Sequence, residues 1–311
     1  MAAGEHRRDH GGAHEVTAVQ TPSRTATAPG RGGSAVLAMR DAGLSYGERA
    51  LWSHLDLDLA PGEFVAVLGP NGAGKTSLLR TVLGQQRLTS GTMSFLGRPV
   101  RRGHRRIGYV PQQRLMEAGT PLRARDMVAQ GVTGSRWGVV PAGRAERARV
   151  DRILDEVGAT AFADAPVAEL SGGEQQRTRV GQAIAADPAL LLCDEPLISL
   201  DLRHQRGITE LIDRQRRQRD AAVLFVTHDV NPILDVVDRV LYIAGGRFRI
   251  GSPDEVLRAE VLSDLYGTPV DVVRTMGRVV IVGANEAHDQ TGAHHHCDPD
   301  PRTATPDEGR I

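Results

Sequence analysis

A glycine-rich loop with a lysine near its end constrains the fold more than any other feature of this sequence. Residues 69–76 read GPNGAGKT, which fits the pattern G-x-x-x-x-G-K-[ST]. A continuous apolar run, EFVAVLG, leads into the loop, and a helical pattern, TSLLRTVLG, follows it. This order predicts a buried strand, a tight turn and a helix that opens on the turn. We therefore expect an α/β domain with a mostly parallel sheet.

The same loop predicts a phosphate-binding site. Its glycines let backbone N–H groups converge on one point, and the helix N-terminus adds a partial positive charge. Lys75 can reach the β- and γ-phosphates, and the Thr76 hydroxyl is a ligand for Mg²⁺. ATP and Mg²⁺ are the expected ligands. The expected nucleotide-binding residues are Gly69, Pro70, Asn71, Gly72, Ala73, Gly74, Lys75, Thr76 and Ser77.

A second glycine turn, LSGGEQQR at residues 170–177, begins another helical pattern. Ser171 and Glu174 have the spacing of a capping box. A cap needs only the serine, whereas two glycines are conformationally unfavourable there. Consecutive glycines expose N–H groups at a helix N-terminus, which is a place where anions bind. We therefore expect a second anion site at Ser171, Gly172, Gly173 and Glu174.

Two further buried strands end in side chains that can bind a metal ion or transfer a proton. The run LLLC ends in Asp194 and Glu195, and the run VLFVT ends in His228. Two carboxylates at a strand end are unfavourable unless a cation lies beside them. We expect Asp194 to bind Mg²⁺ and Glu195 to orient or deprotonate a water molecule. The strand end also predicts that His228 belongs to the site.

The chain divides into a folded centre and two polar ends. Residues 1–34 and 285–311 have no hydrophobic periodicity and are expected to be disordered. The domain is predicted at residues 35–284. It begins with an antiparallel part, because the segment HLDLDL alternates strictly. A helical subdomain is expected at about 114–186. The histidines and the cysteine of the C-terminal tail suit zinc, but such tracts are often incidental, so metal binding there is a hypothesis.

Composition narrows the class of protein. Lys plus Arg and Asp plus Glu both total 38, and aromatic residues are 4%, so no nucleic-acid partner is expected. Two cysteines make no disulfide framework, which favours a reducing compartment. No apolar run approaches the roughly 18 to 20 residues that cross a bilayer, and the first residues lack the features of a secretory signal. A cytoplasmic location is therefore expected.

The combined motifs resemble the ATP-binding subunit of an ABC transporter, over about residues 36–267. In that family the signature sequence LSGGQ completes the ATP site of the partner subunit, and this chain has Glu174 in place of the glutamine. The resemblance implies a P-loop NTPase core, ATP hydrolysis and two copies that enclose ATP between them. It also implies a separate integral-membrane permease, which would hold the chain at the cytoplasmic face of the cell membrane.

The resemblance assigns four more residues by position. Tyr46 resembles the aromatic residue that stacks on adenine. Gln112, in IGYVPQQ, resembles the glutamine that contacts Mg²⁺ and water and couples to the permease. Asp201 lies in a segment that resembles the loop that crosses between the two subunits, although Ile198 departs slightly from the small residues usual there. His228 resembles the histidine that contacts the γ-phosphate.

The transported substrate follows only from a finer resemblance. The segments HDVNPILDVVDRVLYI and VLSDLYGTPVDVVRTMGRVVIVG resemble the bacterial zinc and manganese uptake ATPases. This implies import of a divalent metal ion, with an exported substrate-binding protein as an indirect partner. The siderophore-iron branch is similar and stays open, as does an ATPase of iron–sulfur assembly. Chromosome-organising relatives carry long coiled coils, and translation-linked relatives usually carry two cassettes, neither of which is seen here.

Overall fold

The computed structural model describes residues 34–112, 121–134 and 143–283. The predicted tails therefore lie outside the described residues, apart from Ser34, and so does the hypothesis of a metal-binding tail. Among the described residues, no helix is both long enough and apolar enough to cross a membrane.

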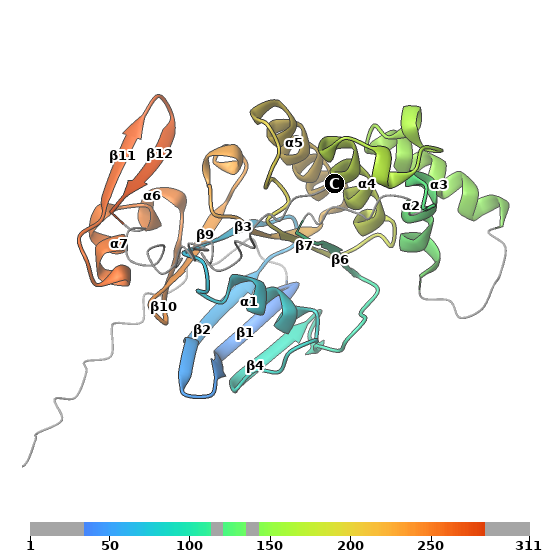
Figure 1. The fold of residues 1–311 in the computed structure, drawn as a ribbon. Helices are drawn as coiled ribbons and strands as arrows, with labels where there is room; N and C mark the ends of the chain where they lie inside the picture. The colour runs from blue at the N-terminus through green and yellow to red at the C-terminus, as the bar shows by residue number, and fades with distance from the viewer. Residues whose placement is uncertain (1–33, 113–120, 135–142, 284–311) are drawn as a thin grey trace, which may run out of the picture. The chain divides into compact units, whose positions relative to one another are not determined.

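A six-stranded sheet forms the centre of the domain (Figure 1). Its strand order is β10-β9-β3-β8-β7-β6, and every neighbouring pair is parallel except β9 and β10. The strands are β3 (Phe64–Leu68), β6 (Ile107–Val110), β7 (Leu190–Asp194), β8 (Ala222–Val226), β9 (Arg239–Ala244) and β10 (Arg247–Gly251). The predicted mostly parallel α/β core is confirmed.

Both faces of the inner strands β3, β7, β8 and β9 are buried, which explains why these strands are almost continuous apolar runs. In β3, Phe64, Ala66 and Leu68 belong to one hydrophobic cluster, whereas Val65 and Val67 belong to another. Helices cover the first face, and their contacts make the first cluster. They are α2 (Ala124–Thr133), α3 (Arg144–Glu156), α4 (Gly172–Ile184), α5 (Leu202–Arg219), α6 (Pro253–Val256) and α7 (Ala259–Tyr266).

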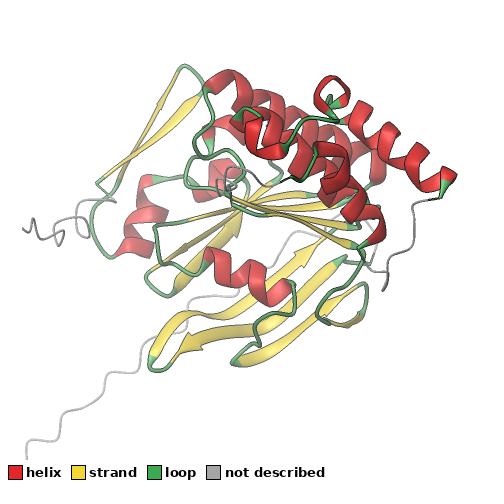
Figure 2. Ribbon diagram, turned by 45° about the vertical axis from the view of Figure 1, so that its right-hand side comes forward, coloured by secondary structure: helices red, strands yellow, loops and turns green. Residues whose placement is uncertain are grey.

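The second face packs against helix α1 (Lys75–Val82) and an antiparallel sheet of order β2-β1-β4-β5. Its strands are β1 (Leu37–Tyr46), β2 (Arg49–Leu59), β4 (Ser90–Phe95) and β5 (Arg98–Pro99). Helix α1 lies between the two sheets in Figure 2. In β2, Leu55, Leu57 and Leu59 are buried while His54 and Asp56 are exposed. The alternation in the sequence thus gives β2 one buried face and one solvent-exposed face.

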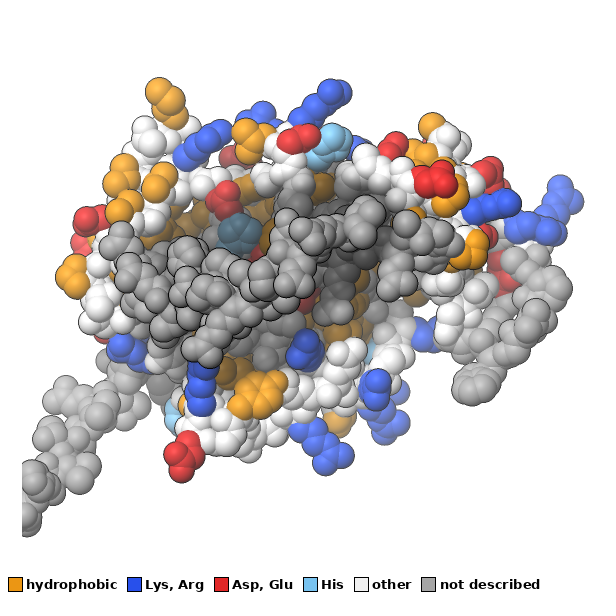
Figure 3. Space-filling view, in the orientation of Figure 1, with side chains coloured by type: hydrophobic (Ala, Val, Ile, Leu, Met, Phe, Trp, Pro, Cys, Tyr) orange, Lys and Arg blue, Asp and Glu red, His pale blue; other side chains and the backbone are white. Residues whose placement is uncertain are grey.

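Short elements complete the domain. The 3₁₀ helices are η1 (Thr160–Phe162), η2 (Val167–Glu169) and η3 (Asn231–Ile233), and a hairpin joins β11 (Asp271–Thr275) to β12 (Arg278–Val282). Charged side chains of both signs are interspersed over the face drawn in Figure 3, in keeping with the formal net charge of zero.

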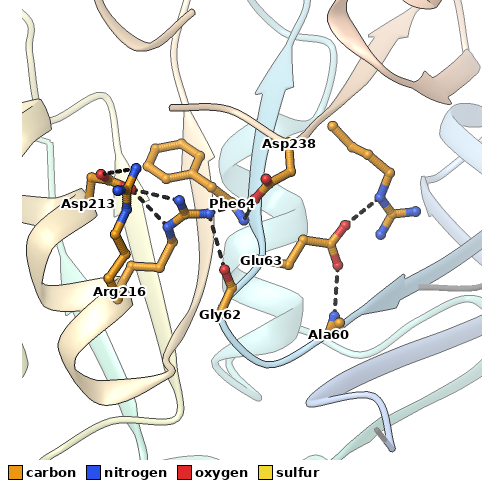
Figure 4. A network of polar contacts seen from close by, with 9 residues as sticks. Ala60, Gly62, Glu63, Phe64, Asp213, Arg216 and Asp238 are labelled. Carbon is orange, nitrogen blue, oxygen red and sulfur yellow. Dashed lines mark hydrogen bonds and ion pairs between the residues drawn. The ribbon is translucent and has the colours of Figure 1, made fainter. Parts of the chain in front are cut away.

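A buried arginine joins helix α5 to the beginning of β3 (Figure 4). Arg216 donates hydrogen bonds to Asp213, to Asp238 Oδ2 at 2.6 Å and to the Gly62 carbonyl at 3.1 Å. The same Asp238 oxygen accepts from the Phe64 backbone N–H at 2.7 Å. The strand that leads into the glycine-rich loop is therefore held by contacts with residues far away in the sequence.

Candidate nucleotide-binding site

The glycine-rich loop turns sharply between β3 and α1, and two of its positions require glycine. Gly69 has φ 139°, and a Cβ atom there would lie 2.0 Å from the Ile243 carbonyl oxygen. Gly74 has φ 97° and is the N-cap residue of α1. A side chain would strain both conformations. The first turn of α1 therefore opens directly on the loop, with its backbone N–H groups unpaired within the helix.

Lys75 lies folded over the loop and is buried, at 6% exposed. Its Nζ donates hydrogen bonds to the carbonyl oxygens of Gly69 at 2.7 Å and Pro70 at 3.0 Å. Burial lowers the pKa of Lys75, and the charges of Glu195 and Asp194 oppose that shift. The ammonium group thus lies where a phosphate above the loop would meet it.

Thr76 and Asp194 meet across the sheet edge. The Thr76 hydroxyl donates to Asp194 Oδ1 at 3.2 Å, and the Tyr109 hydroxyl donates to Oδ2 at 3.3 Å. Asp194 is 3% exposed, and burial raises the pKa of its carboxyl group while the two hydrogen bonds lower it. A hydroxyl and a carboxylate side by side are oxygen ligands of the kind that Mg²⁺ prefers. The residues present therefore fit this ion.

Glu195 and His228 form a pair beside Asp194. Glu195 Oε2 lies 2.9 Å from His228 Nδ1. Glu195 is one of the few non-glycine residues with positive φ, at 46°, and its N–H donates to the Val226 carbonyl at 3.0 Å. Unfavourable backbone conformations of this kind concentrate at functional sites. A carboxylate held by an imidazole next to a phosphate loop can orient and deprotonate water.

One relationship explains why these residues meet. Strands β3, β8, β7 and β6 are consecutive neighbours and run parallel. Their carboxyl ends lead to the glycine-rich loop, His228, the Asp194–Glu195 pair and Gln112, respectively. Parallel strands end at one edge of the sheet, where ligands bind in folds of this class. Gln112 is exposed at that edge.

The second glycine turn is a complete capping box at the start of α4. Ser171 donates from both its backbone N–H and its hydroxyl to Glu174 Oε2, at 2.9 and 2.7 Å. The Glu174 N–H donates back to Ser171 Oγ at 3.4 Å. The hydrogen bonds from Ser171 lower the pKa of the Glu174 carboxyl group. The expected capping box is present, and its carboxylate occupies two donors of the turn.

Asp201 caps helix α5 beside this turn. It accepts hydrogen bonds from the His204 backbone N–H at 2.9 Å and lies 2.8 Å from His204 Nδ1. The His204 ring rests on Gly173, where a Cβ atom would lie 2.5 Å from the ring. A cavity of about 780 Å³ opens between the first turns of α4 and α5. His204 thus joins two predicted site segments.

Tyr46 ends strand β1 and is 52% exposed. Its hydroxyl donates to Gln86 Oε1 at 2.8 Å, which fixes the ring at the surface. The position is compatible with stacking on a flat ligand.

Sequence reasoning missed Tyr109 and His204. The Tyr109 hydroxyl donates a hydrogen bond to Asp194 because β6 pairs with β7. The sequence does not show which strands are neighbours in the sheet. The spacing of Asp201 and His204 is a local signal, since an aspartate caps the N–H three residues later.

No cluster of three or more His, Cys, Asp or Glu side chains suited to a metal ion occurs among residues 34–112, 121–134 and 143–283. Within those residues, Thr76 and Asp194 are in contact at 3.2 Å and would hold Mg²⁺ beside the expected phosphates.

Comparison with known sequences identifies the family of the chain. The family profile described as ABC transporter matches residues 52–198. A zinc transport system ATP-binding protein, TroB, from Treponema pallidum (strain Nichols) is 33% identical over 73% of this chain and 85% of its own length. A zinc import ATP-binding protein, ZnuC, from Roseobacter denitrificans is 34% identical, with 72% and 82% covered. A sulfate/thiosulfate import ATP-binding protein, CysA, from Mycolicibacterium paratuberculosis is 36% identical, with 73% and 62% covered.

Solved structures show the same fold. A metal-chelate type ABC transporter in an inward-facing conformation has a TM-score of 0.68 at 25% identity, with 80% of this chain and 96% of that chain covered. A nucleotide-free ATP-binding cassette from an ABC transporter has a TM-score of 0.64 at 18% identity, with 74% and 96% covered.

Proposed function

The chain belongs to the ATP-hydrolysing subunits of ABC transporters, and we propose that it energises the import of a divalent metal ion, zinc or manganese, through a separate membrane permease. The observation that supports hydrolysis is the meeting of the glycine-rich loop, Asp194, Glu195 and His228 at one edge of the core sheet.

The share of each relative's length that this chain matches supports a metal ion, rather than sulfate, as the substrate. The zinc-transport relatives match this chain over 82% and 85% of their own lengths, so they extend little beyond it. The sulfate importer is matched over only 62% of its length, so more than a third of that protein has no counterpart here. Zinc or manganese is accordingly the substrate that we propose.

The site residues have the following proposed roles. The N–H groups of the loop and Lys75 bind the β- and γ-phosphates of ATP. Thr76, Asp194 and Gln112 would hold Mg²⁺, and the bound ion would neutralise charge on the phosphates. Glu195 takes a proton from the water whose oxygen attacks the γ-phosphorus atom. The bond between that phosphorus and the β–γ bridging oxygen breaks, and ADP leaves with the bridging oxygen. His228 contacts the γ-phosphate, and it positions Glu195 through the 2.9 Å contact between its Nδ1 and Glu195 Oε2.

The remaining site residues are proposed to act between two copies of the chain. Ser171, Gly172, Gly173 and Glu174 would face the ATP that is bound to the second copy, and Asp201 would cross between the copies. Tyr46 would stack on adenine. Donors that surround the γ-phosphate in a dry site stabilise its transferring charge more than donors in water do.

The proposed partners are a membrane permease, a second copy of the chain and, indirectly, an exported substrate-binding protein. The permease would hold the chain at the cytoplasmic face of the cell membrane. Gln112, exposed at the sheet edge, is the proposed point of coupling.

Transport in proteoliposomes tests this function. The full chain is reconstituted with the permease and the binding protein encoded beside it, and uptake of radioactive Zn²⁺, Mn²⁺, sulfate and a ferric siderophore is measured with and without ATP. We expect ATP-dependent uptake of Zn²⁺ or Mn²⁺, and none with the Glu195→Gln chain. Uptake of ferric siderophore alone would establish the alternative importer, and uptake of sulfate alone would reject the proposed substrate.

A further inference from the structure

The capping box of α4 occupies the donors that an anion at this turn would need. Both the N–H and the hydroxyl of Ser171 point to one oxygen of Glu174. An anion at a helix N-terminus is held by such free donors. In the subunit as the structure describes it, a carboxylate of the chain's own first turn takes that place.

The charge of this carboxylate matters as much as its hydrogen bonds. The donors of Ser171 lower the pKa of Glu174, so the group is ionised at neutral pH. A hydrogen bond to an ionised acceptor is roughly twice as strong as one between neutral groups. A triphosphate that approaches the turn would therefore have to displace a strong acceptor and also meet a like charge.

We propose that Glu174 competes with the ATP of the second copy for the Ser171 hydroxyl, and that it thereby weakens the ATP-bound dimer. The inference rests on the sandwich dimer of the proposed function. When the copies close, the hydroxyl proton of Ser171 turns from Glu174 Oε2 to an oxygen of the γ-phosphate. The Ser171 N–H stays on the carboxylate, which keeps α4 capped.

A glutamine at this position would behave differently. Its amide oxygen accepts the same two hydrogen bonds, so the helix stays capped, but the acceptor is neutral and releases the hydroxyl more readily. It also presents no negative charge to the phosphates. The Glu174→Gln chain is therefore expected to form a tighter ATP-bound dimer.

The chain contains a matched control. Ser252 and Glu255 form the same kind of capping box at α6, where the Ser252 N–H donates to Glu255 Oε2 at 2.8 Å. The bonds from Ser252 likewise lower the pKa of Glu255. Glu255 belongs to no proposed site segment. Glu255→Gln therefore makes the same chemical change to a cap and leaves the signature turn untouched.

Dilution experiments on the full chain measure the effect. All variants carry Glu195→Gln so that ATP persists, and the dimer Kd is determined at saturating Mg-ATP by sedimentation velocity. We expect Glu174→Gln to lower the dimer Kd on the order of tenfold or more, because each dimer holds two such turns with a charge-assisted bond. Glu255→Gln should leave the Kd unchanged. The affinity of the monomer for a fluorescent ATP analogue should not change in either variant.

The outcomes separate the two proposals. If no dimer forms with ATP in either the Glu174→Gln chain or the chain with only Glu195→Gln, the sandwich of the proposed function is refuted. If that chain dimerises but Glu174→Gln dimerises no more tightly, the competition is refuted while the sandwich stands. The Tm of each variant, measured by thermal unfolding, shows whether the N-terminus of α4 is still capped. Should Glu174→Gln fail to fold, Glu174→Ala removes the competing acceptor as well and must also tighten the dimer.

Discussion

Glu195 Oε2 and His228 Nδ1 lie 2.9 Å apart, at the ends of two neighbouring parallel strands. The carboxylate is largely buried and the imidazole is half exposed, with side-chain exposures of 14% and 60%. The histidine is therefore accessible to a ligand while its Nδ1 contacts the largely buried carboxylate. This arrangement leads to the first prediction.

Glu195→Gln should keep ATP binding and lose turnover. The amide is close in shape to the carboxylate but accepts no proton, and general base catalysis typically contributes 10² to 10⁴ in rate, so a loss of about that size is expected. Phosphate release measures turnover, and a fluorescent ATP analogue measures binding. Hydrolysis by the variant at the parental rate would show that another group is the base.

Lys75→Ala should abolish ATP binding, because the buried ammonium lies at the mouth of the phosphate loop. Lys75 is also the only lysine in the sequence. Labelling with an amine-reactive reagent, read by mass spectrometry, therefore reports on this one side chain, with the N-terminal amine as internal control. Mg-ATP should protect Lys75 and leave the terminal amine unprotected. If Lys75 is labelled in the absence of Mg-ATP and labelled equally in its presence, the nucleotide binds elsewhere.

Arg216→Met should destabilise the fold. Asp238 loses its arginine partner, Asp213 keeps only Arg217, and the Gly62 carbonyl before β3 loses a donor. Breaking a buried ion pair on one side costs about 3 to 5 kcal/mol in the free energy of unfolding, with the lower end expected because Asp238 is half exposed.

Arg217→Met is the matched control. Arg217 also pairs with Asp213, at 2.9 Å, but its side chain is 67% exposed against 9% for Arg216. Exposed pairs contribute about 0 to 1 kcal/mol. Urea unfolding of both variants gives the comparison. Equal free energies of unfolding would show that the network of Figure 4 does not hold β3.

Cys193 should be inert in the folded protein. It lies in β7 with no exposed surface, and burial raises the pKa of its thiol. Because the thiolate is the reactive form, a thiol reagent at pH 8 should modify one group fewer in the native chain than in the chain unfolded by guanidinium. Between pH 7 and pH 9, Cys193 should stay unmodified as long as the protein remains folded. Equal modification in both states would contradict the buried position.

Much of the site was predictable from the sequence because its determinants are local. The glycine-rich loop requires particular backbone conformations at Gly69 and Gly74, and the capping box places Ser171 and Glu174 three residues apart. The Asp194–Glu195 pair follows a run that is apolar at every position, which only a strand buried on both faces needs. Local geometry of this kind can be predicted directly from the residue types.

Other features depend on which strands become neighbours, and residue types along the chain do not specify that. The Tyr109 bond to Asp194, the Arg216 bond to Asp238 and the approach of Gly69 to Ile243 all join distant segments. The sequence by itself determined the kinds of element and the chemistry at their ends. Only the tertiary structure decided which ends meet, because the free energy of packing apolar faces depends on the whole set of contacts at once.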